Sequence, residues 1–255
     1  MNQGPQMSNV VPLTKAVKAL IIVNVAVWVG LVLVVQNLFL HGNQIFDWFA
    51  LVPARVISDF WVWQTFTYMF LHTTGVFHIL FNMLVLWWFG AELELRWGPR
   101  FFVTYYLICG VGAGVIYLLG TFAYYLVTGQ VLGMAAPLVG ASGATYGLLL
   151  AFGMLFGERV ISFMMLFPMK AKYFVMIMGI VELVTMLDSG ANSSVANLAH
   201  LGGIAVGFLF LTFVSRQRAG AKAASSSKRG RRLKLVVDNE RSKEDPDRSG
   251  PKYWN

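Results

Sequence analysis

The sequence predicts an all-α membrane protein with six transmembrane helices and a long first external loop. Hydrophobic residues make up 57% of the 255 residues and charged residues only 13%, whereas soluble domains have about 45–50% and 25%. The first 215 residues carry 8 basic and 7 acidic groups, too few to cover a water-exposed surface. A soluble enzyme is therefore excluded.

Six apolar runs approach the roughly 20 residues that a spanning helix requires. The first follows Lys15 and Lys18; it is too long for the apolar region of a signal peptide, and no clear cleavage site follows it. The apolar stretch Val160–Met169 is too short to cross and contains Pro168, so we interpret it as an interfacial loop. The six predicted spans are Ala16–Leu40, Val76–Leu95, Phe101–Val127, Val139–Gly157, Ala171–Leu187 and Ala196–Val214.

The basic residues predict the orientation. Cytoplasmic connections are enriched in Lys and Arg, and 19 of the 20 basic residues fall in the N-terminal segment, two alternate connections and the tail, leaving only Arg55 on the other side. Both termini are therefore expected in the cytoplasm. The external loop His41–Gly75 carries aromatic residues suited to the headgroup level, namely Phe46, Trp48, Phe49, Phe60, Trp61 and Trp63.

The chain is expected to divide into three regions: a short cytoplasmic segment 1–15, a membrane domain 16–215 and a basic tail 216–255. The tail holds 12 of the 20 basic residues and lacks helical periodicity, so we expect it to be disordered. Its cluster Lys228–Lys234 either contacts anionic lipid headgroups or serves only as a topology signal. Because the excess charge is confined to the tail, no nucleic-acid partner is expected. The single Cys109 excludes an intramolecular disulfide and a Cys-rich metal site.

Four polar side chains stand out because polar groups in a bilayer are costly and are usually functional or paired. They are His78, Asn82, Ser142 and His200. Each lies in the first few residues of a helix that runs inward from the external side. The predicted topology therefore places all four at one depth, about one turn below the outer surface.

Ser142 and His200 form a candidate nucleophile and base. Each lies in a stripe of small residues that lets helices approach closely: Gly143 with Gly147, and Ala199 with Gly203 and Gly207. Close packing would bring the hydroxyl within reach of the imidazole, which is a suitable base near pH 7. Alternatively, Ser142 is a small packing residue and His200 is bonded to a carbonyl. Tyr146, one turn from Ser142 on the same face, is expected to pack against the imidazole.

His78 and Asn82 share a face of the second span, being spaced i, i+4. They can donate to an oxyanion formed by serine attack, or they form only an interhelical hydrogen bond. A metal site is not expected, since no third ligand is near in the sequence. Glu182 is interpreted as making a structural hydrogen bond. Asp188 has no spacing that supports a third catalytic role, so a two-residue Ser–His arrangement is preferred.

Taken together, these motifs resemble the rhomboid family of intramembrane serine proteases over most of residues 16–215. The resemblance rests on Gly140-Ala141-Ser142-Gly143, on Ala199-His200 with Gly203 and Gly207, on His78 to Asn82, and on Gly90, Glu94 and Gly98 spaced by fours. It implies a six-helix rhomboid-like bundle in which Glu94 is structural. One departure is Trp63-Gln64, where many members have Trp-Arg.

The resemblance also implies the function. It predicts a serine endopeptidase that cleaves single-span transmembrane substrates near the outer membrane face, with no cofactor and no metal, in contact with membrane lipids. A non-catalytic relative that binds or escorts transmembrane helices is the alternative. A transporter is not favoured, because no inverted repeat is visible. The short soluble parts and the absence of a transit peptide favour a bacterial inner membrane.

Overall fold

The protein is mostly helical. The computed structural model describes residues 12–40, 42–163, 167–188 and 195–230. Among these, four helices are long and apolar enough to cross a membrane. They are Lys15–Leu38, composed of α1 (Lys15–Val27), the π-helical η1 (Trp28–Val35) and α2 (Gln36–Leu38), then α6 (Val76–Trp97), α7 (Pro99–Thr128), and Ala196–Gly220 within α12 (Val195–Gly230).

The other two predicted spans are also helical. However, α9 (Ser142–Leu155) has 14 residues and α10 (Ala171–Asp188) has 18, and neither is among the four long apolar helices. At 1.5 Å per residue, α9 is about 21 Å long, shorter than the hydrocarbon core of about 30 Å. A helix of this length is compatible with a membrane protein when other helices enclose it.

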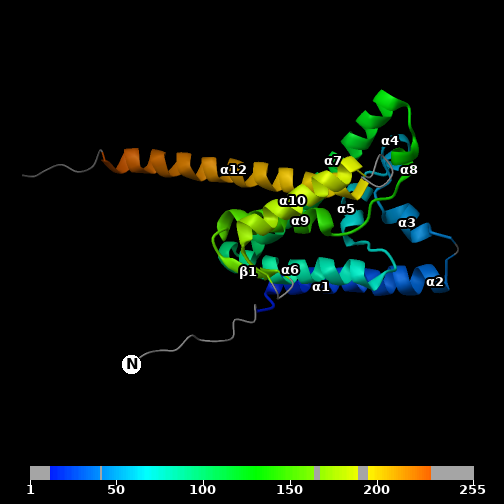
Figure 1. Cartoon of the computed structure of the whole chain (residues 1–255), viewed down its shortest axis with the longest axis horizontal. Helices are drawn as coiled ribbons and strands as arrows, with labels where there is room; N and C mark the ends of the chain where they lie inside the picture. Colours follow the sequence, from blue (N-terminus) through cyan, green and yellow to red (C-terminus); the bar gives the residue numbers. More distant parts are fainter. Residues whose placement is uncertain (1–11, 41, 164–166, 189–194, 231–255) are drawn as a thin grey trace, which may run out of the picture. The chain divides into compact units, whose positions relative to one another are not determined.

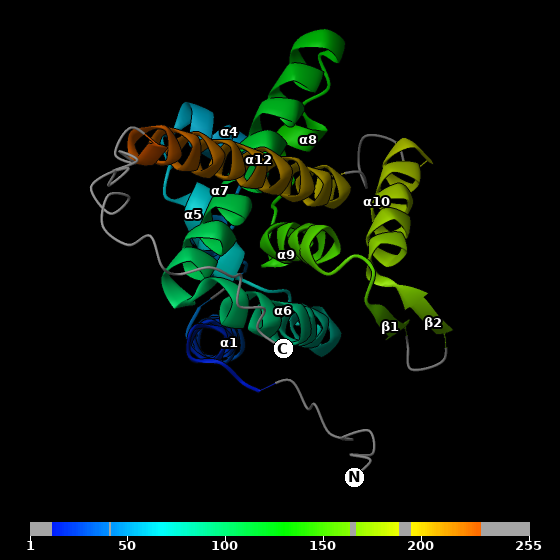
Figure 2. The same cartoon turned by 90° about the vertical axis from the view of Figure 1, so that its left-hand side faces the viewer.

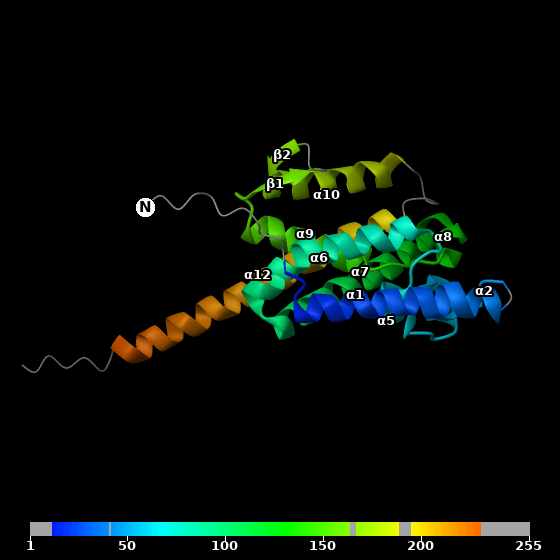
Figure 3. The same cartoon turned by 90° about the horizontal axis from the view of Figure 1, so that it is seen from below.

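Helix α9 occupies the interior of the bundle. Figure 2 shows it nearly end-on, with α6, α7, α10 and α12 around it, and it packs directly against α6, α7 and α10. Figure 3 shows α10 along one side and α1 along the other, with α6 and α9 between them. The main core contains fully buried Phe102, Tyr105, Tyr106, Tyr117 and Leu148.

Two glycines position the helix boundaries around the core. Gly98 has a φ of +81°, a conformation that L side chains rarely adopt, and it separates α6 from α7, which begins at Pro99. Gly140 has a φ of +115° and turns the chain immediately before α9. The fourth helix therefore begins at Ser142 and not at Val139, where the apolar pattern predicts its start.

The connection between the first helix and α6 is folded into short helices (Figure 1). A mutual pair of backbone hydrogen bonds between Leu51 and Leu138 ties this connection to the segment before α9. The short helices are α3 (Gln44–Phe49), α4 (Pro53–Ser58), α5 (Gln64–Thr67) and the 3₁₀ helix η2 (Tyr68–Phe70), and α8 (Leu132–Ala135) lies in the later segment.

Two features differ from the sequence-based expectations. The stretch interpreted as an interfacial loop contains a β-hairpin, with β1 (Val160–Phe163) antiparallel to β2 (Phe167–Lys170) and Val160 opposite Lys170. The pairing satisfies the backbone groups of each strand that face the other strand. Helix α12 continues past Val214 to Gly230, into the predicted disordered tail. The Ala, Lys and Arg residues there have high helix propensity even without an apolar face. The rest of the tail lies outside the described residues.

The chain divides into two compact units, Met1–Thr212 and Phe213–Asn255. All the candidate site residues belong to the first unit. The second unit contains the C-terminal part of α12.

Candidate active site

Ser142 and His200 meet at the start of α9. The Oγ atom of Ser142 lies 2.8 Å from Nε2 of His200, although the two residues are 58 positions apart. Ser142 is the first residue of α9, where backbone N–H groups are unpaired and the helix dipole is positive. The site therefore combines a hydroxyl, a base in hydrogen-bonding contact with it, and a region that stabilises negative charge.

Glycines allow this contact. If Gly203 had a Cβ atom, it would lie 2.8 Å from the carbonyl carbon of Gly143, and nearer still to the carbonyl oxygen. A Cβ on Gly147 would overlap Cys109 of α7. Since these backbones nearly touch, the hydroxyl and the imidazole are held together by packing of the helices that carry them.

Tyr146 stacks on the imidazole. Its ring centroid is 4.4 Å from that of His200, and the two planes are 14° apart. The Tyr146 hydroxyl donates to Oε1 of Glu182, which lies on α10. The ring therefore limits the tilt of the imidazole while its hydroxyl is bonded to a third helix.

His78 lies on the other side of the serine. A Cβ on Gly140 would be 2.8 Å from Nε2 of His78 and 3.8 Å from Oγ of Ser142, so both groups border the same small volume. Nδ1 of His78 lies 3.1 Å from the Thr73 hydroxyl, which leaves Nε2 directed at the site. A glycine is required at position 140 for two reasons: its φ is positive, and a Cβ atom there would collide with His78.

Asn82 is buried one turn below His78. Its side-chain amide donates to the carbonyl of His78 at 2.8 Å, a bond within α6. His72, which precedes α6, is fully buried, and its ring is 5.1 Å from that of His78. Burial, followed by the nearby charge of His78, lowers the pKa of His72 to about 4. His72 is therefore a neutral acceptor, with Nε2 3.5 Å from the Ala141 backbone N–H.

Glu182 lies on the far side of the imidazole from the serine. Its Oε2 atom is 3.0 Å from Nδ1 of His200, and the two side chains are 11% and 17% exposed. The carboxylate lies off the direction of the ring N–H, so the contact is an ion-pair distance and not a well-aligned hydrogen bond. The sequence indicates only that Glu182 needs a partner, because its position relative to His200 depends on how α10 packs. No contact links Asp188 to His200 in the part of the chain that the structure describes.

Glu94 and Gln64 hold segments around the site in place by hydrogen bonds to their backbone groups. Glu94, 5% exposed, accepts from the backbone N–H groups of Ala16 and Val17 at 3.0 and 2.9 Å, so it fixes the start of α1. Gln64 is fully buried; it accepts from the N–H of Val52 at 3.1 Å and donates to the carbonyl of Asp47 at 2.8 Å. A neutral amide thus connects the turns of the segment between the first helix and α6.

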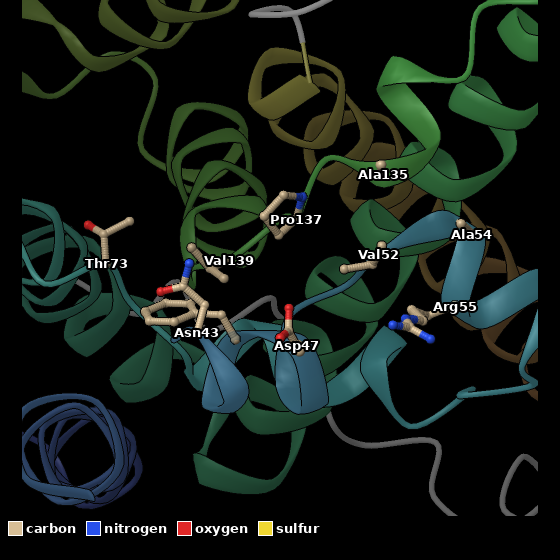
Figure 4. A pocket seen from close by; sticks show the side chains of 10 residues that line it. Asn43, Asp47, Val52, Ala54, Arg55, Thr73, Ala135, Pro137 and Val139 are labelled. Carbon is tan, nitrogen blue, oxygen red and sulfur yellow. The ribbon is translucent and has the colours of Figure 1, made fainter. Parts of the chain in front are cut away.

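A cavity of about 490 Å³ opens beside the site. Two of its lining residues neighbour the site: Thr73 contacts His78, and Val139 directly precedes Gly140. Figure 4 shows Asp47 and Arg55 on its wall. Within the described residues, no group of three or more His, Cys, Asp or Glu side chains is arranged to hold a metal ion. The cavity walls are backbone and side chains of the external loop and of the segment before α9.

A rhomboid domain model matches residues 59–217, more than half of the chain. The chain belongs to the rhomboid family. It is 32% identical to RHOMBOID-like protein 1 of Arabidopsis thaliana over 71% of this chain and 42% of that protein. It is 28% identical to the rhomboid protease GlpG of Serratia proteamaculans, over 62% of this chain and 50% of that protein.

This rhomboid protein also matches GlpG of Salmonella choleraesuis, with 29% identity over 76% of this chain and 63% of the relative. The chain thus spans about half the length of the curated relatives that it matches. The family and the four long apolar helices establish a multi-pass integral membrane protein, and distant relatives are rhomboid proteases.

Proposed function

We propose that this rhomboid protein is an intramembrane serine endopeptidase with Ser142 as nucleophile and His200 as general base and acid. The observation that carries the proposal is the 2.8 Å contact between Oγ and Nε2, made where α9 begins. A hydroxyl needs a base to become a nucleophile, and this geometry supplies one.

The proposed reaction needs only the Ser142 hydroxyl, the His200 imidazole and water. As Oγ bonds to the substrate carbonyl carbon, its proton passes to Nε2, and the carbonyl π electrons move to the oxygen. The C–N bond then breaks, and Nε2 returns the proton to the leaving amine. Water, giving a proton to Nε2, attacks the resulting ester; the bond to Oγ breaks, and the proton returns to Oγ.

The oxyanion is stabilised by donors at the start of α9. Nε2 of His78 and Oγ of Ser142 border the volume beside Gly140, the backbone N–H of Ser142 is the second proposed donor, and Asn82 supports this face of α6. Removing one such donor typically lowers kcat by about 10²–10³-fold. The adjacent cavity gives room for an extended peptide and for water.

The proposed substrates are single-span membrane proteins cut near the outer face. Peptide bonds in a helix are shielded within the bilayer, so the substrate must unwind beside the cavity. We further propose six spans, with α9 and α10 completing the four long helices, and both termini in the cytoplasm, because 19 of the 20 basic residues lie on that side. The proposed location is a bacterial inner membrane, with the basic tail near anionic headgroups.

The test is cleavage of a model single-span substrate by the detergent-purified protein. We expect Ser142→Ala and His200→Ala to abolish cleavage, and the exposed Ser58→Ala to leave it unchanged. A fluorophosphonate probe should label Ser142 in the wild type and not in His200→Ala. Cleavage that persists in both site variants would disprove the mechanism. Retained substrate binding without wild-type cleavage would favour a helix-binding role instead.

A further inference from the structure

Glu182 is an acidic side chain in the middle of an apolar helix. The buried side chains of α10 are those of Ala171 and Glu182, and the carboxylate is 11% exposed. An acidic group at this depth is costly unless it is paired, and it usually has a function.

The carboxylate of Glu182 on α10 accepts hydrogen bonds from two other helices. The Tyr146 hydroxyl on α9 donates to Oε1, and the Asn197 amide on α12 donates to Oε2 at 2.8 Å. Both donors are neutral. Within the described residues, the ion pair that Glu182 makes is the one to His200. The carboxylate is therefore held by two neutral donors and directed at one group able to carry positive charge.

The contacts form a sequence across the imidazole. Nε2 of His200 is 2.8 Å from Ser142, and Nδ1, on the opposite edge of the ring, is 3.0 Å from Oε2 of Glu182. The other titratable groups facing the ring are Tyr146 on α9 and His78 on α6, whose positive charge would repel that of His200. Glu182 is the group that opposes this repulsion.

We propose that Glu182 is a positioning residue for His200, extending the pair to Ser142–His200–Glu182. The negative charge of the carboxylate, 3.0 Å from Nδ1, favours the tautomer that carries its proton there, which leaves Nε2 free to accept the serine proton, and it stabilises the imidazolium formed in that step. The proton does not pass to Glu182. The inference rests on the proposed protease function.

A purely structural role makes a different prediction. If Glu182 serves only to hold α10 against α9 and α12, its loss lowers stability but does not change how the imidazole titrates. The pH dependence of Ser142 reactivity therefore separates the two roles.

The experiment compares Glu182→Gln with Glu94→Gln in the purified full chain. Both variants replace a buried membrane carboxylate by an amide, but Glu94 bonds the start of α1 and does not contact the imidazole. Cleavage of the single-span substrate and fluorophosphonate labelling are measured from pH 4 to 9, each corrected for the folded fraction from thermal unfolding.

We expect Glu182→Gln to lower kcat by about 10²–10⁴-fold with little change in KM, since the wrong tautomer is favoured. The acidic midpoint of the labelling rate should move down by about one pH unit or more, because protonated His200 loses its counter-charge. Glu182→Asp, which keeps the charge with a shorter reach, should recover part of the rate. Glu94→Gln should lower the unfolding temperature and leave the acidic midpoint in place.

The inference is overturned if folded Glu182→Gln keeps both the wild-type labelling rate and its pH midpoint. If Glu182→Gln does not fold, Glu182→Met decides in the same way, because it also removes the charge: an unchanged labelling rate and pH midpoint in that variant also overturn the inference. Cleavage that survives Ser142→Ala would instead refute the proposed function, so the two failures are distinguishable.

Discussion

Replacing Gly203 by Ala tests whether close helix packing creates the active site. The added Cβ would lie 2.8 Å from the carbonyl carbon of Gly143. Ordinary carbon–carbon contacts are about 3.5–4.0 Å, so the helices must separate by about 1 Å. Because this obstacle is backbone, no side-chain rotation can relieve it.

The same separation acts on the Ser142–His200 pair. Ser142 and His200 lie on these two helices at 2.8 Å, and about 1 Å more takes them beyond hydrogen-bonding range. A misplacement of about 1 Å typically costs about 10²-fold in rate. We therefore expect kcat/KM for the single-span substrate, and the rate of fluorophosphonate labelling, to fall about 100-fold.

Gly179→Ala is the matched control. Its Cβ would meet nothing closer than Ile204 at 3.8 Å, and Ala in place of Gly within a helix is favourable by about 0.5–1 kcal/mol. It should retain activity and unfold at the same or a higher temperature. If folded Gly203→Ala instead cleaves the substrate at a rate within a factor of about three of the wild type, close helix packing does not determine the distance between Ser142 and His200.

Three other predictions concern the supporting residues. Glu94→Gln leaves the backbone N–H groups of Ala16 and Val17 facing an amide, so the free energy of unfolding should fall by about 2 kcal/mol. Fluorophosphonate labelling of Ser142 per folded molecule should not change. An unfolding temperature equal to that of the wild type would contradict this prediction. Gln64→Ala leaves the partly buried N–H of Val52 without its acceptor, so the free energy of unfolding should fall by about 2 kcal/mol. Proteolysis between the first helix and α6 should become faster, and an unchanged rate would refute the role of Gln64. His72 has a pKa lowered from 6.5 to about 4, so the unfolded chain takes up a proton that the folded chain does not. The contribution of His72 to stability should therefore be constant above pH of about 6.5, and it should lower the free energy of unfolding by up to about 3 kcal/mol as the pH falls toward 4. His72→Gln should reduce the pH slope of thermal unfolding by this contribution, and an identical slope would contradict the argument.

Residue spacing along single helices predicted much of what lies near the site. The small residues around Ser142 and His200 indicated two helices that approach closely, and the i, i+4 spacing placed Tyr146 on the face of Ser142. These are properties of one helix at a time, fixed by 3.6 residues per turn. The common depth predicted for the polar residues rests on hydropathy and charge, which the bilayer constrains, and it stays a prediction.

Other features depended on contacts between distant segments. The hairpin between α9 and α10 could not be distinguished from a loop, because its strands are four residues each and their pairing leaves no apolar pattern along the chain. The burial of His72 and the network around Gln64 depend on how the external loop folds back on itself, which hydropathy does not encode.

The amino-acid sequence by itself determined that the chain enters a membrane and which helices carry the polar groups. It also determined which helix faces carry small residues that allow close packing. Only the tertiary structure decided that Glu182 lies 3.0 Å from His200. Helical periodicity fixes the direction of a side chain relative to its own axis, but the rotation of α10 against α9 and α12 comes from packing among all three. No pattern within any one of them contains that information.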